Sequence, residues 1–275
     1  MENHPSKAPK APRDPWVSPT VILYFGITTT FVGTLVGSFF AADQLPLLGW
    51  VAIFLIQSLM VFLAFTPMHE ASHGIASRKR WVNEAVLLGC TPFFLADTSL
   101  FRLIHITHHS KTNQGEEDPD HFTAAPTLTG RWVRSFLLVF NYYRFAWTKL
   151  KFKDRALYYR SFFSASGPIL LLISAILMGK LTWLLVAWGL PSFISTGILS
   201  FVNTAWPHDT ENDPTRMGNT RIHQVPGWLQ LIMCNQNLHL VHHLQPTLPW
   251  WKYPEVWEAN REKWASQGAK IHDYR

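Results

Sequence analysis

The chain alternates between long apolar stretches and polar segments that are rich in histidine. Residues 17–42, 47–67, 162–179 and 181–205 contain no Lys, Arg, Asp or Glu, and roughly 20 apolar helical residues span a bilayer core. Short polar turns, at residues 43–46 and 179–180, divide these stretches into two pairs. The pattern predicts an all-α integral membrane protein with four transmembrane helices in two hairpins.

The distribution of positive charge predicts how the helices are oriented. If the N-terminus is cytoplasmic, both hairpin turns lie outside, and Lys180 is the only external residue among the 24 Lys and Arg residues. Basic residues favour the cytoplasmic side of membrane proteins. We therefore expect both termini and the polar segments on that side, where the polar segments form a helical cap. The formal net charge of +6 then reflects membrane orientation, and we expect no nucleic-acid partner.

The remaining segments have simpler interpretations. We expect residues 1–16 to form a disordered cytoplasmic tail. Residues 17–260 are expected to form the membrane domain, and residues 261–275 a C-terminal cytoplasmic tail. Residues 82–103 are apolar but interrupted by Gly, Pro, Asp and Arg, which indicates an interfacial or re-entrant segment. Residues 131–160 mix aromatic and basic side chains, as expected at a membrane surface or in a lid over the cap. Cys90 and Cys234 lie near a reducing compartment, so we expect no disulfide.

Histidine is concentrated in three short clusters. They read His-Glu-Ala-Ser-His at 69–73, His-Ile-Thr-His-His at 105–109 and His-Leu-Val-His-His at 239–243, and contain eight of the 13 histidines. Positions i, i+3 and i+4 share one face of a helix, so each cluster directs its imidazoles at one small volume. His208 emerges from the last apolar stretch where the clusters should converge. The candidate metal ligands are therefore His69, His73, His105, His108, His109, His208, His239, His242 and His243.

The number of candidate ligands points to two metal ions. Imidazole suits Zn, Cu, Fe and Ni alike, but a single tetrahedral site takes only four ligands. Two irons at a membrane surface would serve O2 activation and attack on an unactivated C–H bond. The other four histidines, at positions 4, 121, 223 and 272, are interpreted as surface groups or as neighbours of the ligands.

Two other metal functions fit the sequence less well. His69-Glu70-x-x-His73 matches the H-E-x-x-H motif of zinc metalloproteases, but an intramembrane protease would leave six clustered histidines unexplained, and the chain has no Asp-Gly pair for a third ligand. A metal transporter or store would place ligands near the bilayer midplane, whereas the apolar stretches contain almost no ionisable residues.

Four polar residues near the clusters are candidates for a supporting role. Asp118 and Asp120 follow the second cluster in an acidic loop, which is either solvated surface or a source of acceptors that orient imidazoles. Asn203 and Asn237 are candidates for a water-mediated ligand or for a hydrogen-bond partner of a ligand.

The three boxes, in this order and with hairpins between them, resemble the membrane-bound fatty-acid desaturase and hydroxylase superfamily over about residues 20–260. The resemblance implies a helical membrane fold with a cytoplasmic cap, a di-iron centre, O2 as oxidant and a separate electron donor. Within the superfamily, residues 236–250 are most similar to β-carotene hydroxylases of cyanobacterial type. The loop at 113–122 is similar to theirs and to that of carotenoid ketolases, and His208 matches their additional histidine. Glu70 departs from their usual Asp, which leaves the substrate open.

The resemblance and the residues together lead to one expectation about function. We expect a non-haem di-iron oxygenase that uses O2 and external electrons to hydroxylate a long apolar lipid, with a carotenoid ring as the leading substrate. A fatty-acyl lipid desaturase is the alternative. The expected electron donor is a separate ferredoxin, cytochrome or rubredoxin-like protein that docks on the basic cytoplasmic face. Hydroxylation, desaturation and ketolation are not distinguished by the sequence.

Overall fold

The computed structural model of the chain describes residues 18–150, 155–208 and 213–275, so the predicted tail at 1–16 lies outside the described residues. The longer helices are α1 (Pro19–Ala41), α2 (Leu47–Ser72), α3 (Arg80–Gly89), α5 (Thr98–Lys111), α6 (Leu128–Phe145), α7 (Arg155–Leu177), α9 (Leu190–Ser200) and α12 (Tyr253–Ser266). Short helices are α4 (Thr91–Phe94), α8 (Leu181–Leu184), α10 (Gly227–Ile232), α11 (His239–Leu244), η1 (Gly115–Glu117), η2 (Pro119–Thr123), η3 (Ala146–Leu150), η4 (Leu185–Gly189), η5 (Phe201–Ala205) and η6 (Trp250–Lys252).

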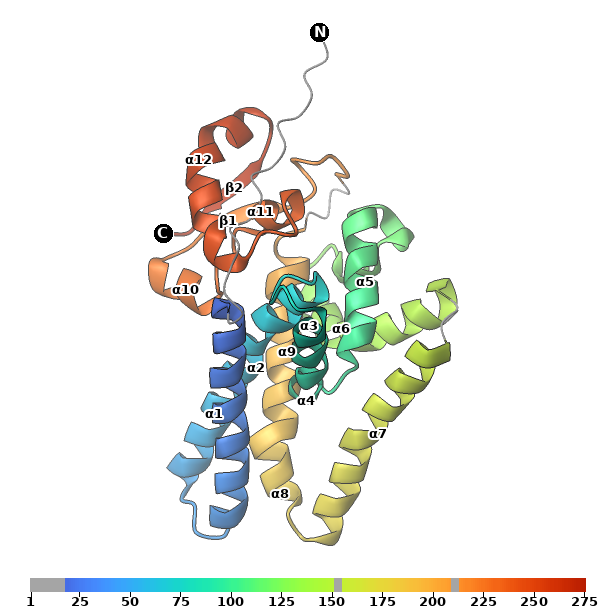
Figure 1. Cartoon of the computed structure of the whole chain (residues 1–275), viewed down its shortest axis with the longest axis vertical. Helices are drawn as coiled ribbons and strands as arrows, with labels where there is room; N and C mark the ends of the chain where they lie inside the picture. The colour runs from blue at the N-terminus through green and yellow to red at the C-terminus, as the bar shows by residue number, and fades with distance from the viewer. Residues whose placement is uncertain (1–17, 151–154, 209–212) are drawn as a thin grey trace.

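Two helical hairpins form the elongated part of the molecule. Helices α1 and α2 are one hairpin, and α7 is followed by the nearly continuous helix that runs from α8 through η4 and α9 to η5. Figure 1 shows both hairpin turns at the lower end. Lys180 Nζ lies 2.7 Å from Asp43 Oδ2, which joins the two turns directly. The two helical hairpins therefore turn at the same end of the molecule.

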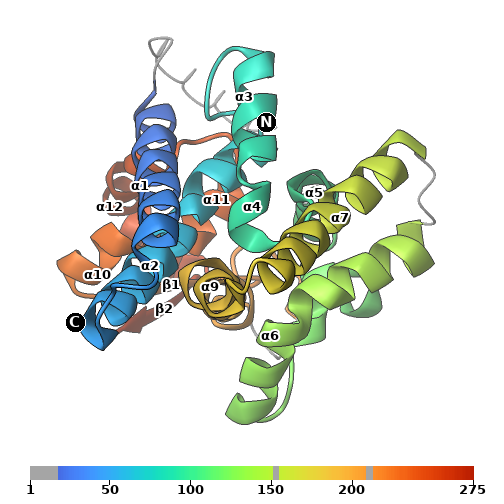
Figure 2. The ribbon, with the colours of Figure 1, turned by 90° about the horizontal axis from the view of Figure 1, so that it is seen from below.

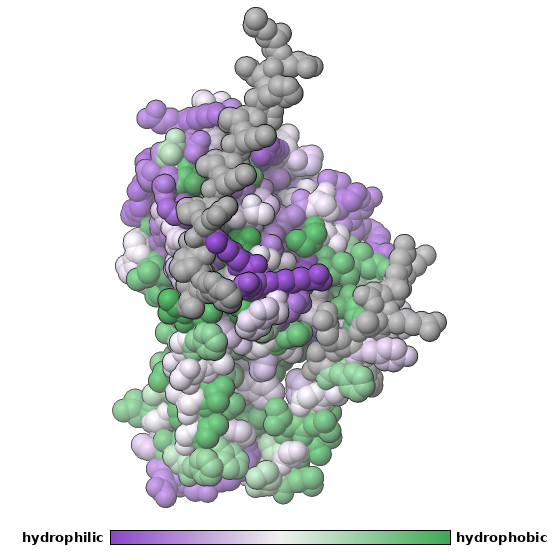
Figure 3. All heavy atoms as spheres, in the orientation of Figure 1, coloured by the Kyte–Doolittle hydropathy of each residue, from purple (hydrophilic) through white to green (hydrophobic). Residues whose placement is uncertain are grey.

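Three of the predicted spans meet the length and hydropathy needed to cross a membrane. They are Pro19–Ala41, Leu47–Ser72 and Leu181–Ala205. Most of the predicted span at 162–179 lies in α7, which ends at Leu177, but the apolar part of that helix among the described residues is only Ser166–Leu177. Helix α7 therefore belongs to the expected hairpin. Its apolar part is too short to cross a membrane by the length and hydropathy that the other three spans meet. Figure 3 shows apolar residues covering the lower part of the molecule and hydrophilic ones gathered in the upper part.

A sharp bend separates the first and second histidine boxes. The pair formed by Arg80–Phe94 and Thr98–Lys111 is apolar enough for a span but bends by 103°. Leu95 has a left-handed φ of 52° at this bend, and Asp97 caps α5 by accepting a hydrogen bond from the Ser99 backbone. This geometry agrees with the predicted interfacial or re-entrant segment, and it directs α5 away from the hairpins toward the cap (Figure 1).

The cap contains a small sheet that was not predicted. Strands β1 (Arg221–Gln224) and β2 (Lys270–Asp273) pair in parallel, with Ile222 opposite Ile271. Each strand has only four residues, too few for an alternating pattern to be recognised. The last 15 residues, predicted as a tail, are here the end of α12 and strand β2. A buried cluster that includes Ile222, Leu240, Tyr253 and Trp257 packs the sheet against α11 and α12.

Helix α9 is the central element around which the functional region is assembled. Seen from below in Figure 2, α9 lies between α2 on one side and α6 and α7 on the other, and it packs against both α2 and α6. On the α6 side, the Trp132 ring stacks on Phe201 with centroids 3.8 Å apart. Helix α6 also carries exposed Val133, Leu137 and Phe140, which agrees with the predicted place of this segment at a membrane surface.

Candidate metal centre

Three helical elements and one loop bring the nine predicted histidines together. Helix α2 continues through Pro67, beyond the predicted end of the span, and carries the first box. Helix α5 carries the second box, and α11 the third. His208 follows η5 at the cap end of the second hairpin. The helical i, i+3 and i+4 spacing places the rings of each box on one side of its helix, so the boxes face one another.

Five of the histidines form the first group, in which one ring nitrogen of each lies within 4.8 Å of all the others. Their Nε2 atoms are linked by four short separations: 3.1 Å from His69 to His242, 2.8 Å from His242 to His109, 3.1 Å from His109 to His105, and 3.0 Å from His105 to His73. The second group consists of His108, His208, His239 and His243. In this group His239 Nε2 lies 3.2 Å from His208 Nε2 and 3.1 Å from His243 Nε2.

Hydrogen bonding alone does not account for the first group. A neutral imidazole Nε2 carries either one hydrogen or one lone pair, so His242, His109 and His105, each with two nitrogen neighbours, cannot satisfy both. A cation between the nitrogens satisfies all five. Metal–nitrogen bonds are about 2.0–2.1 Å long, so ligand nitrogens at right angles lie about 2.9 Å apart and at tetrahedral angles about 3.4 Å. The separations of 2.8–3.1 Å are close to these distances between ligands of one metal ion.

Burial keeps most of the histidines in the neutral form that binds metals; for His108 burial also lowers the pKa, but the charges of Asp118 and Asp120 raise it to about 9. Desolvation lowers the pKa of His73 to about 4 and that of His208 to about 3. It also lowers the pKa values of His239, His242 and His243 well below the ordinary value, with the neighbouring histidines adding to the effect. Neutral imidazole is the form that coordinates metal ions. The donor set therefore fits two metal positions of five and four nitrogens.

The acidic loop supports one of these histidines. Asp118 Oδ1 lies 2.8 Å from His108 Nδ1, and Asp118 also accepts hydrogen bonds from the backbone of Asn113 and Asp120. Burial alone would raise the pKa of Asp118, but the charge and hydrogen bond of His108 lower it. Asp120 is also buried, and accepts a 2.6 Å hydrogen bond from Tyr142. Both aspartates thus lie beside the histidines and not on the solvated surface.

Two further supports were not predicted. The Tyr253 hydroxyl lies 3.1 Å from His242 Nδ1, and the backbone carbonyl of Asn219 lies 3.1 Å from His208 Nδ1. Such bonds to the second ring nitrogen orient a ligand. Tyr253 is fully buried in the cap. Nothing in the sequence spacing relates Tyr253 or Asn219 to a histidine box, and a hydrogen bond from a backbone carbonyl depends only on the path of the loop.

The two predicted asparagines lie in different surroundings. Asn203 is buried on η5, its Nδ2 donates to the Leu199 carbonyl, and its Oδ1 has no partner among the described residues. It lines the same pocket as His239, so it remains a candidate for holding a water at the metal. Asn237 instead donates from Nδ2 to the His223 carbonyl, and its backbone carbonyl accepts a hydrogen bond from the His223 backbone N–H. It joins β1 to the residues just before the third box.

Glu70 does not occupy the position of a protease general base. Its Oε1 accepts a 2.5 Å hydrogen bond from the Trp250 backbone, and its Oε2 accepts one from Thr20. The carboxylate therefore links α1, α2 and the segment after the third box. His69 and His73 also share their group with three other histidines. The site therefore has neither the free glutamate base nor the ligand set that a zinc protease needs.

Three of the four remaining histidines are described. His223 is buried, stacks on Trp206 with centroids 3.9 Å apart, and lies 3.3 Å from the Trp206 carbonyl. His272 is exposed on β2 opposite His223, and His121 lies at partial exposure on η2. His4 lies outside the described residues. These three are not in either group of converging nitrogens.

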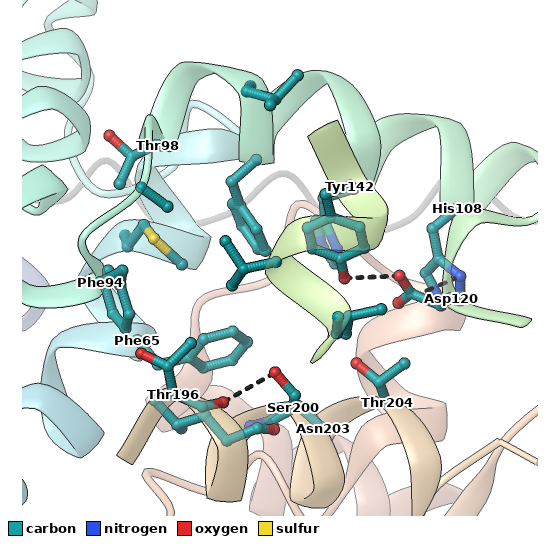
Figure 4. Close-up of a pocket in the computed structure, with 18 of the residues that line it drawn as sticks. Phe65, Phe94, Thr98, His108, Asp120, Tyr142, Thr196, Ser200, Asn203 and Thr204 are labelled. Carbon is teal, nitrogen blue, oxygen red and sulfur yellow. Dashed lines mark hydrogen bonds and ion pairs between the residues drawn. The ribbon is translucent and has the colours of Figure 1, made fainter. Parts of the chain in front are cut away.

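An apolar pocket ends at the histidines. It encloses about 800 Å³ including its mouth, and residues from α2, α5, α6 and α9 line it. His105 of the first group and His108 and His239 of the second all contribute to its lining. Figure 4 shows Phe65 and Phe94 toward one end and His108, Asp120 and Tyr142 toward the other. A long apolar molecule in this pocket would therefore reach both groups.

Comparison with known proteins agrees with this arrangement. The model of the fatty acid desaturase family matches residues 45–275. The chain belongs to the fatty acid desaturase family. A β-carotene ketolase of a Paracoccus species is 27% identical over 198 residues, which cover 70% of this chain and 72% of the ketolase. A β-carotene ketolase of Haematococcus lacustris is 24% identical over 76% of this chain and 62% of its own length.

The similarity extends to enzymes that act on acyl lipids. An sn-1 oleoyl-lipid 12-desaturase of Anabaena variabilis is 24% identical over 239 residues, which cover 76% of this chain and 67% of the desaturase. The predicted superfamily is therefore confirmed. As a member of this family the chain is an O2-dependent oxidoreductase of the membrane. The family includes iron-dependent oxygenases, and the two histidine groups fit such a metal centre.

Proposed function

We propose that the chain is a membrane di-iron oxygenase that hydroxylates a long apolar lipid, with a carotenoid ring as its substrate. The observation that carries the proposal is the apolar pocket whose lining includes histidines of both groups. His69, His73, His105, His109 and His242 would hold one iron, and His108, His208, His239 and His243 the other. The bound irons supply the activation of O2 for attack on an unactivated C–H bond.

The residues of the chain provide the surroundings that this chemistry needs. Phe65, Phe101 and Leu138 line the pocket with apolar surface, so an apolar lipid binds there by displacing water. The bond between Asp118 and His108 fixes the ring that lies at the pocket. In our proposal the cap faces the cytoplasm, and a separate one-electron carrier such as a ferredoxin or a cytochrome docks on its basic surface.

Desaturation of a fatty-acyl lipid is the second candidate. The similarity to sn-1 oleoyl-lipid 12-desaturases of two cyanobacteria favours it, and it would use the same histidines. The relatives that act on carotenoids are named as ketolases, so ketolation of a ring is the third possible outcome at the same pocket.

Expression in a carotenoid-producing host separates these outcomes. Pigments and fatty acids of the host are analysed by mass spectrometry, with the His242→Ala variant as the inactive control. A new hydroxylated pigment supports the proposal, and a new keto pigment changes the reaction but not the substrate. New double bonds in acyl chains together with unchanged pigments would replace the proposal with the second candidate.

Metal analysis of the purified protein tests the centre independently of the substrate. We expect two iron ions per chain, because nine converging imidazoles exceed the ligand set of one ion. Zinc at one ion per chain, without iron, would overturn the di-iron proposal.

A further inference from the structure

The predicted metal ligands divide between two faces of the centre. Three of them line the apolar pocket: His105, His108 and His239. Three others do not line it and are partly exposed: His73, His109 and His243. The exposed rings form a row, because the ring centroids of His73 and His109 lie 4.9 Å apart and those of His109 and His243 lie 4.5 Å apart. The row includes members of both histidine groups, so both groups are approached from outside without crossing the pocket.

A run of basic residues lies beside this row. The basic run consists of three exposed residues at the entry to α3: Arg78, Lys79 and Arg80. The side-chain nitrogen of Asn83 donates to the carbonyls of both Gly74 and Lys79, at 3.2 and 3.3 Å. Because one nitrogen contacts both carbonyls, the basic run is folded back against the residue that follows His73.

The positive charge of the basic run has little compensation nearby. Residues 71–83 contain no Asp or Glu. Glu70 is buried, and Glu84 forms an ion pair with Arg102 at 2.7 Å. Within the described part of the chain, Arg78 and Arg80 form no ion pair. Figure 3 shows strongly hydrophilic residues at the level of α3, above the apolar lower part of the molecule.

We propose that the basic run and the exposed row of histidines form the docking surface for an acidic one-electron carrier. The inference rests on the proposed function and assigns its electron donor to one face of the cap. Opposite charges steer such partners together and set their orientation, and a carrier held by the basic run lies next to the exposed edge of His73. Each encounter transfers one electron, so the carrier is oxidised and the metal centre is reduced by one electron, with no exchange of atoms. Docking on this face leaves the pocket free for the lipid.

Binding of a carrier to the purified protein tests the inference without turnover. The carrier is an acidic [2Fe–2S] ferredoxin, and the protein is held in nanodiscs of zwitterionic phosphatidylcholine so that lipid charge does not contribute. Arg78→Glu/Arg80→Glu replaces attraction with repulsion and should raise the Kd about tenfold or more at low ionic strength. High salt screens exposed charges and should remove the difference. Arg261→Glu/Lys263→Glu, at exposed residues of α12, reverses the same number of charges and should change the Kd by less than about twofold.

A milder variant and a contact map cover the case in which the charge reversals prevent folding. Arg78→Gln/Arg80→Gln removes the charges without adding new ones, and should raise the Kd about two- to tenfold. A carbodiimide joins a lysine to a carboxylate in direct contact with it, and peptide mass spectrometry should find the ferredoxin linked to Lys79. Links to Lys263 alone would place the carrier on another face and overturn the inference.

An anionic lipid headgroup is the competing occupant of the basic run. Phosphatidylglycerol retained by the purified protein is measured by mass spectrometry for the wild type and for Arg78→Glu/Arg80→Glu. If the variant retains less of this lipid but binds the ferredoxin as the wild type does, the basic run is a headgroup site and the inference is overturned.

The iron content of the same preparations separates the inference from the proposed function. Protein without iron would refute the proposed function and the inference with it. Iron-loaded protein whose ferredoxin Kd does not depend on Arg78 and Arg80 would overturn only the inference. If the ferredoxin does not bind, an acidic haem cytochrome takes its place. Cytochrome binding that depends on the two arginines supports the inference, and failure of both carriers to bind overturns it.

Discussion

At the scale of single residues, the histidines differ in the group that lies within hydrogen-bond distance of their Nδ1 atom. A carboxylate lies against the second nitrogen of His108, a phenol against that of His242, and a backbone carbonyl against that of His208. An anionic acceptor raises the basicity of a ligand more than a neutral one does. The two metal positions proposed here are therefore expected to differ in affinity, because only the group with His108 has carboxylate support.

Removing the Tyr253 hydroxyl tests whether this residue positions a metal ligand. Tyr253→Phe keeps the buried ring but deletes the bond to His242, and loss of such a bond typically lowers metal affinity about 10- to 100-fold. Iron content after titration with a chelator in micelles measures the effect. Tyr274→Phe, at a residue that is half exposed, serves as the control. Equal iron retention by both variants would show that Tyr253 only packs the cap.

The lowered pKa values predict an acid-sensitive fold. Burial lowers the pKa of His73 to about 4 and that of His208 to about 3, whereas a histidine in the unfolded chain titrates near 6.5. The unfolded chain therefore binds protons first as the pH falls. The contribution of these two histidines to the free energy of unfolding of the metal-free protein should be fully present above about pH 6.5 and decrease below it, by about 1.4 kcal/mol per pH unit for each of them.

Thermal unfolding of the metal-free protein between pH 7.5 and 4 measures this dependence. His208→Gln should make the decrease shallower, because one titrating group is lost. A midpoint that stays constant from pH 7 to pH 5 would contradict the prediction.

At the scale of elements, the close approach of α6 and α9 defines two walls of the pocket. A Cβ atom on Gly197 would lie 2.4 Å from Phe136 Cδ1, so only glycine allows this approach. Gly197→Ala should force Phe136 aside and destabilise the protein by about 1–3 kcal/mol, as overpacking of a core does. Gly33→Ala on α1 is the control, since a Cβ atom at that residue would meet no neighbouring side chain within 4 Å. Equal thermal midpoints for the two variants would argue against tight packing here.

The elements also show where sequence patterns lose their predictive value. The hairpins were predictable because long uncharged stretches have few alternatives to a helix in a membrane. Strands β1 and β2 were not, since their pairing joins residues about 50 positions apart through four-residue segments that have no period of their own. The bend between α4 and α5 was predictable from Gly, Pro and charged residues, but its 103° angle was not.

At the scale of the whole molecule, the hairpin turns lie at the lower end, whereas α5 and α11, which carry two of the histidine boxes, lie in the upper part (Figure 1). Positive charge predicts that the turns lie outside the cell, and cysteine labelling tests this. Cys90 and Cys234 are free but buried, so we expect the labelling reagent to react only with an introduced cysteine. A membrane-impermeant maleimide should label Gln44→Cys, at the exposed first turn, in intact cells. It should label Glu262→Cys, exposed on α12, only after permeabilisation. The opposite pattern would reverse the orientation.

The sequence by itself determined the membrane hairpins and the nine histidines, because both depend on local periods: uncharged stretches of bilayer length, and spacings that share a helical face. Only the tertiary structure decided how these histidines divide into groups of five and four and that Tyr253 and Asn219 support them. It also decided which side chains of α9 face the pocket. These features depend on packing between segments far apart in the chain, such as His69 against His242, and no local pattern encodes such contacts.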